Sequence, residues 1–250
     1  MELAKTCLVI DARKLQSLDL DGPALRIRVY SQCSRLFPLR RLSRIHVLGG
    51  LEQGFQALLH CAEKQIPVAF FTARGKLRCQ LYFPVYENSI IGHWLEHVDF
   101  DIEAKQQYDE WLAHGTLHIL SMMGFRRGAR EIRQQQVGEK LRSICHQKLG
   151  GTAFRDAEAW LQGILSAHLS QLIVRQGLAN QSRGKRRLLE DMTRVCELWL
   201  LYLLAETVVE GGMRIDAYSM ANFYQRHAEQ IEYTVRRMLV QLAGRLEAIV

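Results

Sequence analysis

The chain has 250 residues, of which 48% are hydrophobic and 24% are charged. This composition excludes a disordered or collagen-like protein and is sufficient for one large domain or two modest ones. The most apolar later stretch, residues 195–209, contains Glu197 and Glu206 and is shorter than the roughly 20 apolar residues that a membrane span needs. The first apolar run, residues 7–10, is too short for a signal or an anchor, so we expect a cytoplasmic protein without membrane contact.

The net charge of +7 is unevenly distributed along the chain. Residues 1–85 contain 13 Lys and Arg against 6 Asp and Glu, whereas residues 86–250 contain 20 of each kind. An asymmetry of this size is typical of a surface that meets a polyanion such as nucleic acid. The alternative interpretation is an ordinary basic face that is simply solvated.

The first third of the chain has the pattern of strands. Residues 25–30 alternate apolar and basic side chains, which is the period of a half-buried strand, and residues 19–22 have the composition of a turn before it. Glycines at 49 and 50 end one apolar run, and the helical period of residues 51–64 follows. The strands predicted in this region are residues 6–11, 25–30, 35–39, 44–48, 66–71 and 77–83.

After about residue 84 the apolar residues recur at helical spacing to the end of the chain. The predicted helices are residues 102–123, 126–149, 153–177, 187–209 and 218–249, with a break at Gly211 and Gly212. We therefore predict an α+β protein with a β-rich N-terminal domain, residues 1–85, followed by an all-α domain, residues 86–250.

The order of elements in the first domain resembles a known family. A strand ending in Val47-Leu48-Gly49-Gly50 leads to a helix, then to the strand Gln65-Ile66-Pro67-Val68-Ala69-Phe70-Phe71, and then to the turn Arg74-Gly75. This order is similar to that of the N-terminal domain of the CRISPR adaptation integrase family. In the second domain, Gln176-Gly177-Leu178 followed by Leu188-Leu189-Glu190-Asp191-Met192 resembles that family's Gly-Leu turn and the Asp-containing helix behind it.

The resemblance implies a β-sandwich-like domain joined to a helical domain and paired as a homodimer. In the family, this dimer docks on the small second protein of CRISPR adaptation, binds double-stranded or branched DNA, and inserts short DNA pieces into a repeat array. The chemistry implied uses Mg or Mn held by a Glu, a His and an Asp of the helical domain. Such an ion activates a hydroxyl and neutralises charge on the reacting phosphate.

This sequence departs from the family at those metal ligands. Asp191 fits the Asp position, so Asp191 and its neighbour Glu190 are the catalytic candidates and Asp191 is the candidate metal ligand. Arg194 stands one helical turn later, where the family often has a second acid, and its guanidinium would compete with a divalent cation for Asp191. The loop at residues 179–187 has no His, the nearest His is His168 on the preceding helix, and the family's Glu motif is not found.

Two clusters of basic residues are candidate nucleic-acid contacts. Their composition and spacing suit phosphate binding, with an affinity that falls steeply as salt rises. The alternative for each cluster is a solvated helix end with Arg near a C-terminus. The first cluster consists of Arg126, Arg127, Arg130 and Arg133, and the second of Arg183, Lys185, Arg186 and Arg187.

Two pairs of histidines have a spacing that also occurs at metal sites. His93 and His97 are four residues apart, as are His114 and His118, and each pair lies on one face of a helix. No His-Glu-x-x-His motif is present, so we favour ordinary surface or interhelix histidines. The acidic stretch at residues 87–110 is best interpreted as a solvated face or a protein-docking surface.

Two functions of different class remain open from the sequence. The first is a catalytically impaired, dimeric scaffold that binds DNA, and it is favoured because the family's Glu and His cannot be placed. The second is an active metal-dependent endonuclease or integrase that inserts spacers into a CRISPR array, with Asp191, Glu190 and a His such as His168 as ligands. A resemblance limited to the β-rich domain is the third possibility.

Overall fold

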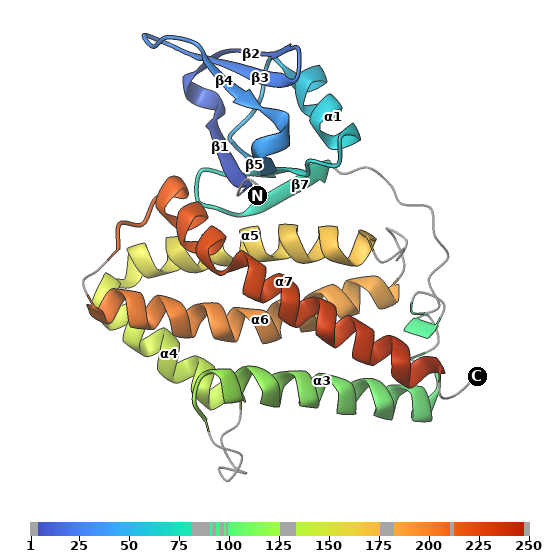
Figure 1. Cartoon of the computed structure of the whole chain (residues 1–250). Coiled ribbons are helices and arrows are strands. Elements are labelled where there is room, and N and C mark those ends of the chain that lie inside the picture. The colour runs from blue at the N-terminus through green and yellow to red at the C-terminus, as the bar shows by residue number, and fades with distance from the viewer. Residues whose placement is uncertain are drawn as a thin grey trace.

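The structure is a computed structural model that describes residues 5–81, 91, 94, 95, 98, 100–125, 134–175, 183–210 and 213–247, without the side chains of 134, 183–185, 246 and 247. All the strands described lie within residues 6–81, and a group of long helices follows (Figure 1). The predicted α+β class is confirmed. The predicted boundary between residues 85 and 86 lies outside the described residues and stays a prediction. Every described helix is too short or too polar to cross a membrane.

The strand part contains two sheets that share one core. The larger sheet has the order β1-β5-β6-β7, parallel except for β6 with β7, and the smaller antiparallel sheet has the order β2-β3-β4. Apolar residues from both sheets and from α1 pack together, as the sandwich-like interpretation implied. The elements are β1 (Thr6–Asp11), β2 (Leu15–Asp21), β3 (Ala24–Val29), β4 (Arg35–Pro38), β5 (Leu42–Leu48), α1 (Phe55–Glu63), β6 (Val68–Phe71) and β7 (Leu77–Leu81), with short 3-10 turns at Ala12–Lys14 and Leu39–Arg41.

The turn predicted at residues 19–22 is wrong in its first three residues. Strand β2 continues through Asp21, and the turn begins at Gly22, whose φ of 56° suits glycine. Acidic residues are poor strand formers, which made this segment read as a turn. Pairing with β3 overrides that preference, because Asp19 lies opposite Arg26 and Asp21 forms an ion pair with the same arginine.

Within the described residues, five long helices form the second part. They are α3 (Ile102–Met122), α4 (Gln134–Leu149), α5 (Gly151–Arg175), α6 (Arg183–Glu210) and α7 (Ala217–Glu247). The predicted helix of residues 126–149 is described only from residue 134. Helix α5 is buried on most of its surface, because it packs against α4, α6, α7 and strand β7. It therefore lies between the other helices and the larger sheet (Figure 1).

The strand part and the helices meet where the β6–β7 turn packs on α5. Gly75 in the turn has a φ of 86°, and a Cβ added to it would lie 2.5 Å from the Trp160 side chain. A Cβ added to Gly163 would lie 2.3 Å from the carbonyl oxygen of Gly75. Beside this contact, the rings of Phe71 and Trp160 lie 5.6 Å apart, and both belong to the core that the helices share with the sheet.

This close approach predicts that Gly163→Ala lowers the free energy of unfolding by about 2 kcal/mol or more, since the obstructing atom is backbone and cannot rotate away. The matched control is Gly244→Ala in α7, where an added Cβ meets nothing within 4 Å. There the loss of glycine's flexibility should raise stability by up to about 1 kcal/mol. Urea unfolding of both variants measures the difference, and equal effects of the two substitutions would contradict the packing described.

Candidate functional site

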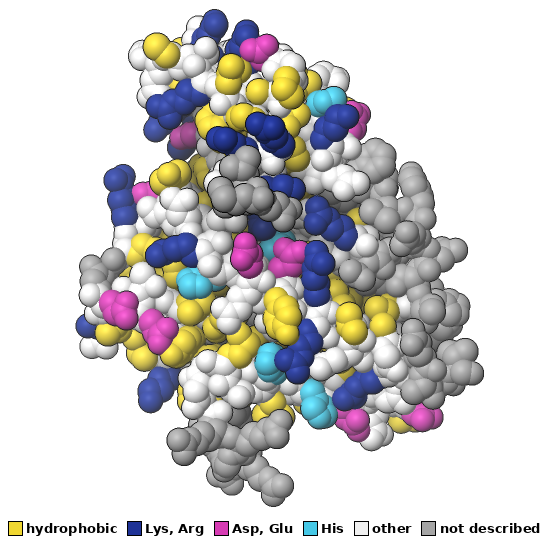
Figure 2. Space-filling model, viewed as in Figure 1, with side chains coloured by type: hydrophobic (Ala, Val, Ile, Leu, Met, Phe, Trp, Pro, Cys, Tyr) yellow, Lys and Arg dark blue, Asp and Glu magenta, His cyan; other side chains and the backbone are white. Residues whose placement is uncertain are grey.

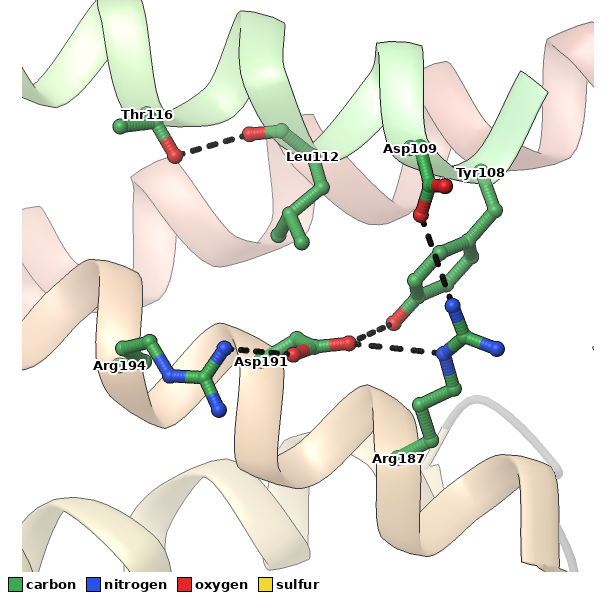
Figure 3. A network of polar contacts seen from close by, with 7 residues as sticks. All are labelled: Tyr108, Asp109, Leu112, Thr116, Arg187, Asp191 and Arg194. Atoms are coloured by element: carbon green, nitrogen blue, oxygen red, sulfur yellow. Dashed lines mark hydrogen bonds and ion pairs between the residues drawn. The ribbon is translucent and has the colours of Figure 1, made fainter. Parts of the chain in front are cut away.

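Asp191 lies on α6 and its side chain faces α3 (Figure 3). Only 13% of that side chain is exposed. The Tyr108 hydroxyl on α3 donates a hydrogen bond of 2.9 Å to Oδ2 of Asp191. Nη1 of Arg194 lies 3.3 Å from Oδ1, and Nε of Arg187 lies 3.8 Å from Oδ2. The two arginines stand four residues before and three residues after the aspartate, which puts all three on one face of the helix.

Arg187 links Asp191 to the neighbouring helix. Its guanidinium carbon lies 4.8 Å from the centre of the Tyr108 ring, and its Nη2 lies 3.5 Å from a carboxylate oxygen of Asp109. A cation over an aromatic face is stabilised by the ring's electrons. Burial and the nearby Asp191 carboxylate raise the pKa of the Tyr108 hydroxyl well above its usual range, so this group remains a donor.

The surroundings of Asp191 do not fit a divalent metal ion. Mg and Mn select several oxygen ligands, commonly carboxylates, with room for water. Here one carboxylate is met by two guanidinium groups and a phenol, and the exposed Glu190 lies outside the network of Figure 3. Within the part of the chain that the structure describes, no group of three or more His, Cys, Asp or Glu could hold a metal ion. The catalytic assignments of Asp191 and Glu190 stay predictions.

The structure places only some of the predicted phosphate contacts. Arg126, Arg127, Arg130 and Arg133 lie outside the described residues, and so do His93 and His97. Arg183 and Lys185 belong to the first turns of α6, Arg186 is exposed there, and Arg187 is engaged by Asp109, Asp191 and Tyr108. On α3, the exposed ring of His114 lies with Nδ1 2.7 Å from the Glu110 carbonyl oxygen, and His118 is half-buried.

His168, considered above as a metal ligand, has other partners. It is buried on α5, with Nδ1 2.9 Å from the Tyr224 hydroxyl and Nε2 3.4 Å from Nη2 of Arg44. The same Nε2 lies 3.7 Å from a carboxylate oxygen of Glu232. This cluster could not be predicted from the sequence, because its members come from three distant elements, β5, α5 and α7. Burial, reinforced by the Arg44 charge, lowers the pKa of His168 to about 4.

Disrupting the Asp191 network should destabilise the fold. Asp191→Ala removes the acceptor of the Tyr108 hydroxyl and the carboxylate that Arg187 and Arg194 face, and we expect a loss of about 1 to 3 kcal/mol in the free energy of unfolding. Glu190→Ala on the exposed side is the control, with an effect within about 0.5 kcal/mol. Thermal unfolding with and without Mn²⁺ completes the test. A higher melting temperature of the unchanged protein in Mn²⁺, lost in Asp191→Ala, would instead identify a metal ligand.

Stability should fall on mild acidification because of two buried histidines. Burial, then the charge of Arg44, lowers the pKa of His46 to about 3, below even that of His168. Since both rings bind protons more readily in the unfolded state, stability is lost as pH falls from about 6.5 toward 4, by about 2 kcal/mol for His168 alone at pH 5. Urea unfolding between pH 7 and 5 measures the slope. His168→Gln should reduce it, and an unchanged slope would contradict this assignment.

Comparison with known sequences finds one family. Residues 11–94 match the sequence model of the family described as CRISPR associated protein Cas1. No match was found among curated protein sequences.

Solved structures of Cas1 proteins and of a casposase match nearly the whole chain. A Cas1 protein from Thermotoga maritima matches with a TM-score of 0.70 and 13% identity, covering 98% of this chain and 97% of that one. A casposase bound to integration product matches with a TM-score of 0.67 and 11% identity, covering 98% and 91%. A Cas6-RT-Cas1–Cas2 complex contains a chain that matches with a TM-score of 0.62 and 15% identity, covering 99% of this chain but only 35% of that one. At these identities the likeness concerns the fold, and the predicted resemblance is confirmed: this chain has the Cas1 fold over nearly its whole length, and residues 11–94 carry the sequence pattern of the Cas1 family.

Proposed function

We propose that this chain is a DNA-binding protein of the CRISPR adaptation integrase type that acts as a dimeric scaffold and lacks metal-dependent catalysis. The observation that carries the proposal is the setting of Asp191, the one family ligand that the sequence places. Two guanidinium groups lie within 4 Å of its carboxylate. A divalent cation would have to approach both like charges and displace the hydrogen bond from Tyr108.

The charge at the start of α6 supports DNA binding over an ordinary solvated helix end. Arg183, Lys185, Arg186 and Arg187 fall at the N-terminus of this helix, and no acid accompanies them in the first turn. The helix dipole is positive at this end, so basic residues there oppose it and reduce helix stability. A phosphate group would be attracted both by the basic side chains and by the helix end.

The surface of the strand part points the same way. Figure 2 shows Lys and Arg side chains gathered over this face of the strand part and continuing along its junction with the helices, with fewer Asp and Glu among them. This agrees with the surplus of positive charge in residues 1–85. A face on which Lys and Arg outnumber Asp and Glu in this way favours a polyanion over a small neutral ligand.

The proposed partners follow from the family resemblance and from two neighbours of similar fold. One is a casposase bound to integration product, and the other lies in a complex with Cas2. We infer that this chain binds double-stranded or branched DNA in the cytoplasm, pairs as a homodimer, and docks the small second adaptation protein. Mg or Mn would be needed only if the chain were active.

DNA binding should depend steeply on salt and not on metal. We expect purified protein to retain linear and branched DNA at low salt, with no cleaved or joined product in Mg²⁺ or Mn²⁺. Each phosphate contact removed by Arg186→Gln or Lys185→Gln should reduce the slope of log affinity against log salt by about 0.9. Lys105→Gln on the exposed face of α3 removes the same charge and should leave the slope unchanged.

Two results would overturn the proposal. Metal-dependent nicking or strand transfer that disappears in Asp191→Ala would show a working active site. Failure to retain any DNA at low salt would remove the binding function itself. Light scattering on the same samples tests the dimer, which should have twice the mass of one chain.

A further inference from the structure

A cavity of about 980 Å³ lies between the strand part and the helices, and its walls are strongly basic. It is bounded by the smaller sheet, β5 and α1 on one side and by α5 and α7 on the other. One acidic side chain, Glu232, faces five basic ones among the described lining residues: Lys5, Arg40, Arg44, Lys64 and Arg175. The cavity is separate from the Asp191 network and from the basic start of α6, and the function proposed above assigns it no specific ligand.

Arg44 on β5 is the unusual member of this wall. Only 9% of the residue is exposed, yet its Nε and Nη1 atoms are buried without a hydrogen-bond partner in the described structure. Its remaining nitrogen, Nη2, lies 3.4 Å from Nε2 of His168, and its guanidinium carbon lies 5.7 Å from the centre of the Tyr224 ring. A buried charged donor without an acceptor is costly, so two nitrogens of one guanidinium without acceptors point to a missing anion.

The backbone of β5 places a second donor beside it. Thr6 on β1 pairs with Leu42 and Cys7 pairs with Arg44, so Ser43 is an extra residue in the ladder. A bulge of this kind breaks the alternation of side chains along a strand and commonly directs them into a site. The Ser43 hydroxyl is also buried without a partner, and Ser43 and Arg44 both line the cavity.

The surrounding groups do not neutralise Arg44. Glu232 is held by Arg236 on its own helix and lies 3.7 Å from His168, and the contact with His168 leads the causes that lower its pKa to about 2. His168 is uncharged at neutral pH, since burial lowers its pKa to about 4. The cavity therefore keeps a surplus of positive charge around the two buried donors.

We propose that this cavity binds a phosphate group, with the Arg44 guanidinium and the Ser43 hydroxyl as its buried donors and Arg40 and Lys64 at its rim. A guanidinium binds phosphate and carboxylate alike, but the surplus of positive charge in this cavity favours phosphate, which carries up to two negative charges. The volume also admits more than phosphate alone, since pockets of roughly 300 to 1,000 Å³ hold drug-sized ligands. The phosphate can belong to a free nucleotide or to the 5′ end of a DNA strand.

The experiment follows the Arg44 side chain directly. The Nε–H signal of Arg44, assigned with Arg44→Gln, is recorded by ¹⁵N NMR during titration with inorganic phosphate, with ATP, and with short DNA carrying a 5′-phosphate or a 5′-hydroxyl. Equal ionic strength is kept with sodium chloride. We expect phosphate compounds to shift this signal and to raise the melting temperature, while chloride does neither.

Because Arg44→Gln could disturb folding, the test also uses substitutions of Arg40 and Lys64 at the rim of the cavity. The side chains of Arg40 and Lys64 are exposed, so their replacement by Gln should not disturb folding. Each of these two substitutions should weaken phosphate binding about threefold, and Arg44→Gln should weaken it about tenfold or more. Arg74→Gln, an exposed position outside the cavity, removes the same charge and should leave binding unchanged.

Comparing the titrations with ATP and with DNA identifies the source of the phosphate. Tighter binding of ATP than of 5′-phosphorylated DNA assigns the site to a nucleotide, and the reverse order assigns it to a strand end. No shift of the Arg44 signal with any phosphate compound, or binding equally weakened by Arg74→Gln, would overturn the proposal. Binding of 5′-hydroxyl DNA through the basic start of α6 is measured in the same series, so failure of this site is distinguishable from failure of the proposed scaffold function.

Discussion

The contact between the β6–β7 turn and α5 determines how the two parts of the chain meet. Backbone approaches backbone at Gly75 and Gly163, and the Phe71 and Trp160 rings pack beside them. Because a side chain at either glycine would collide, the sheet is held against α5 at one distance and in one register. That register places β5 over α5 and α7, and it brings Arg44 to His168 and Tyr224. The junction cavity is therefore a consequence of the same packing that joins the sheet to the helices.

Helix α6 shows how a carboxylate can become part of the packing between helices. Asp191 was predicted to be a metal ligand, but its partners in the structure are Tyr108, Arg187 and Arg194 and not an imidazole and a second carboxylate. The charges of this network balance locally, and its members tie α6 to α3. A site that attracts Mg²⁺ has the opposite character, because clustered carboxylates repel one another until the ion binds. With Arg187 and Arg194 beside it, Asp191 forms an interhelical contact and not a cation site.

The sequence predicted the fold better than the site, because the fold depends on local patterns and the site depends on contacts between residues far apart in the chain. Changes of hydrophobic period revealed the strands, the helices and the α+β class, because these signals are local. Strand β2 was missed since its acidic residues are stabilised by Arg26 across the sheet. The contact between Arg194 and Asp191 was predicted from their spacing and is confirmed, since Nη1 of Arg194 lies 3.3 Å from Oδ1 of Asp191.

Contacts between distant segments left no such local signal. Tyr108 is 83 residues from Asp191, and Arg44 is 124 residues from His168. Arg44 stands in a short apolar strand with nothing beside it to show that its guanidinium is buried. The bulge at Ser43, which is what directs two donors into the cavity, is a property of the pairing with β1 and cannot be read from β5 alone.

The arginines of this protein separate into two kinds, and the difference indicates where a ligand belongs. Arg187 and Arg194 meet carboxylates, so their charge is used within the fold. Arg44 is more deeply buried and meets a neutral imidazole and an aromatic ring, and two of its nitrogens have no hydrogen-bond partner among the described residues. Removing a guanidinium from water without an acceptor opposes folding, and a hydrophobic side chain would serve packing alone equally well. An anion that enters the cavity supplies the missing acceptor, and the same contacts that make Arg44 costly in the empty protein then become the source of affinity.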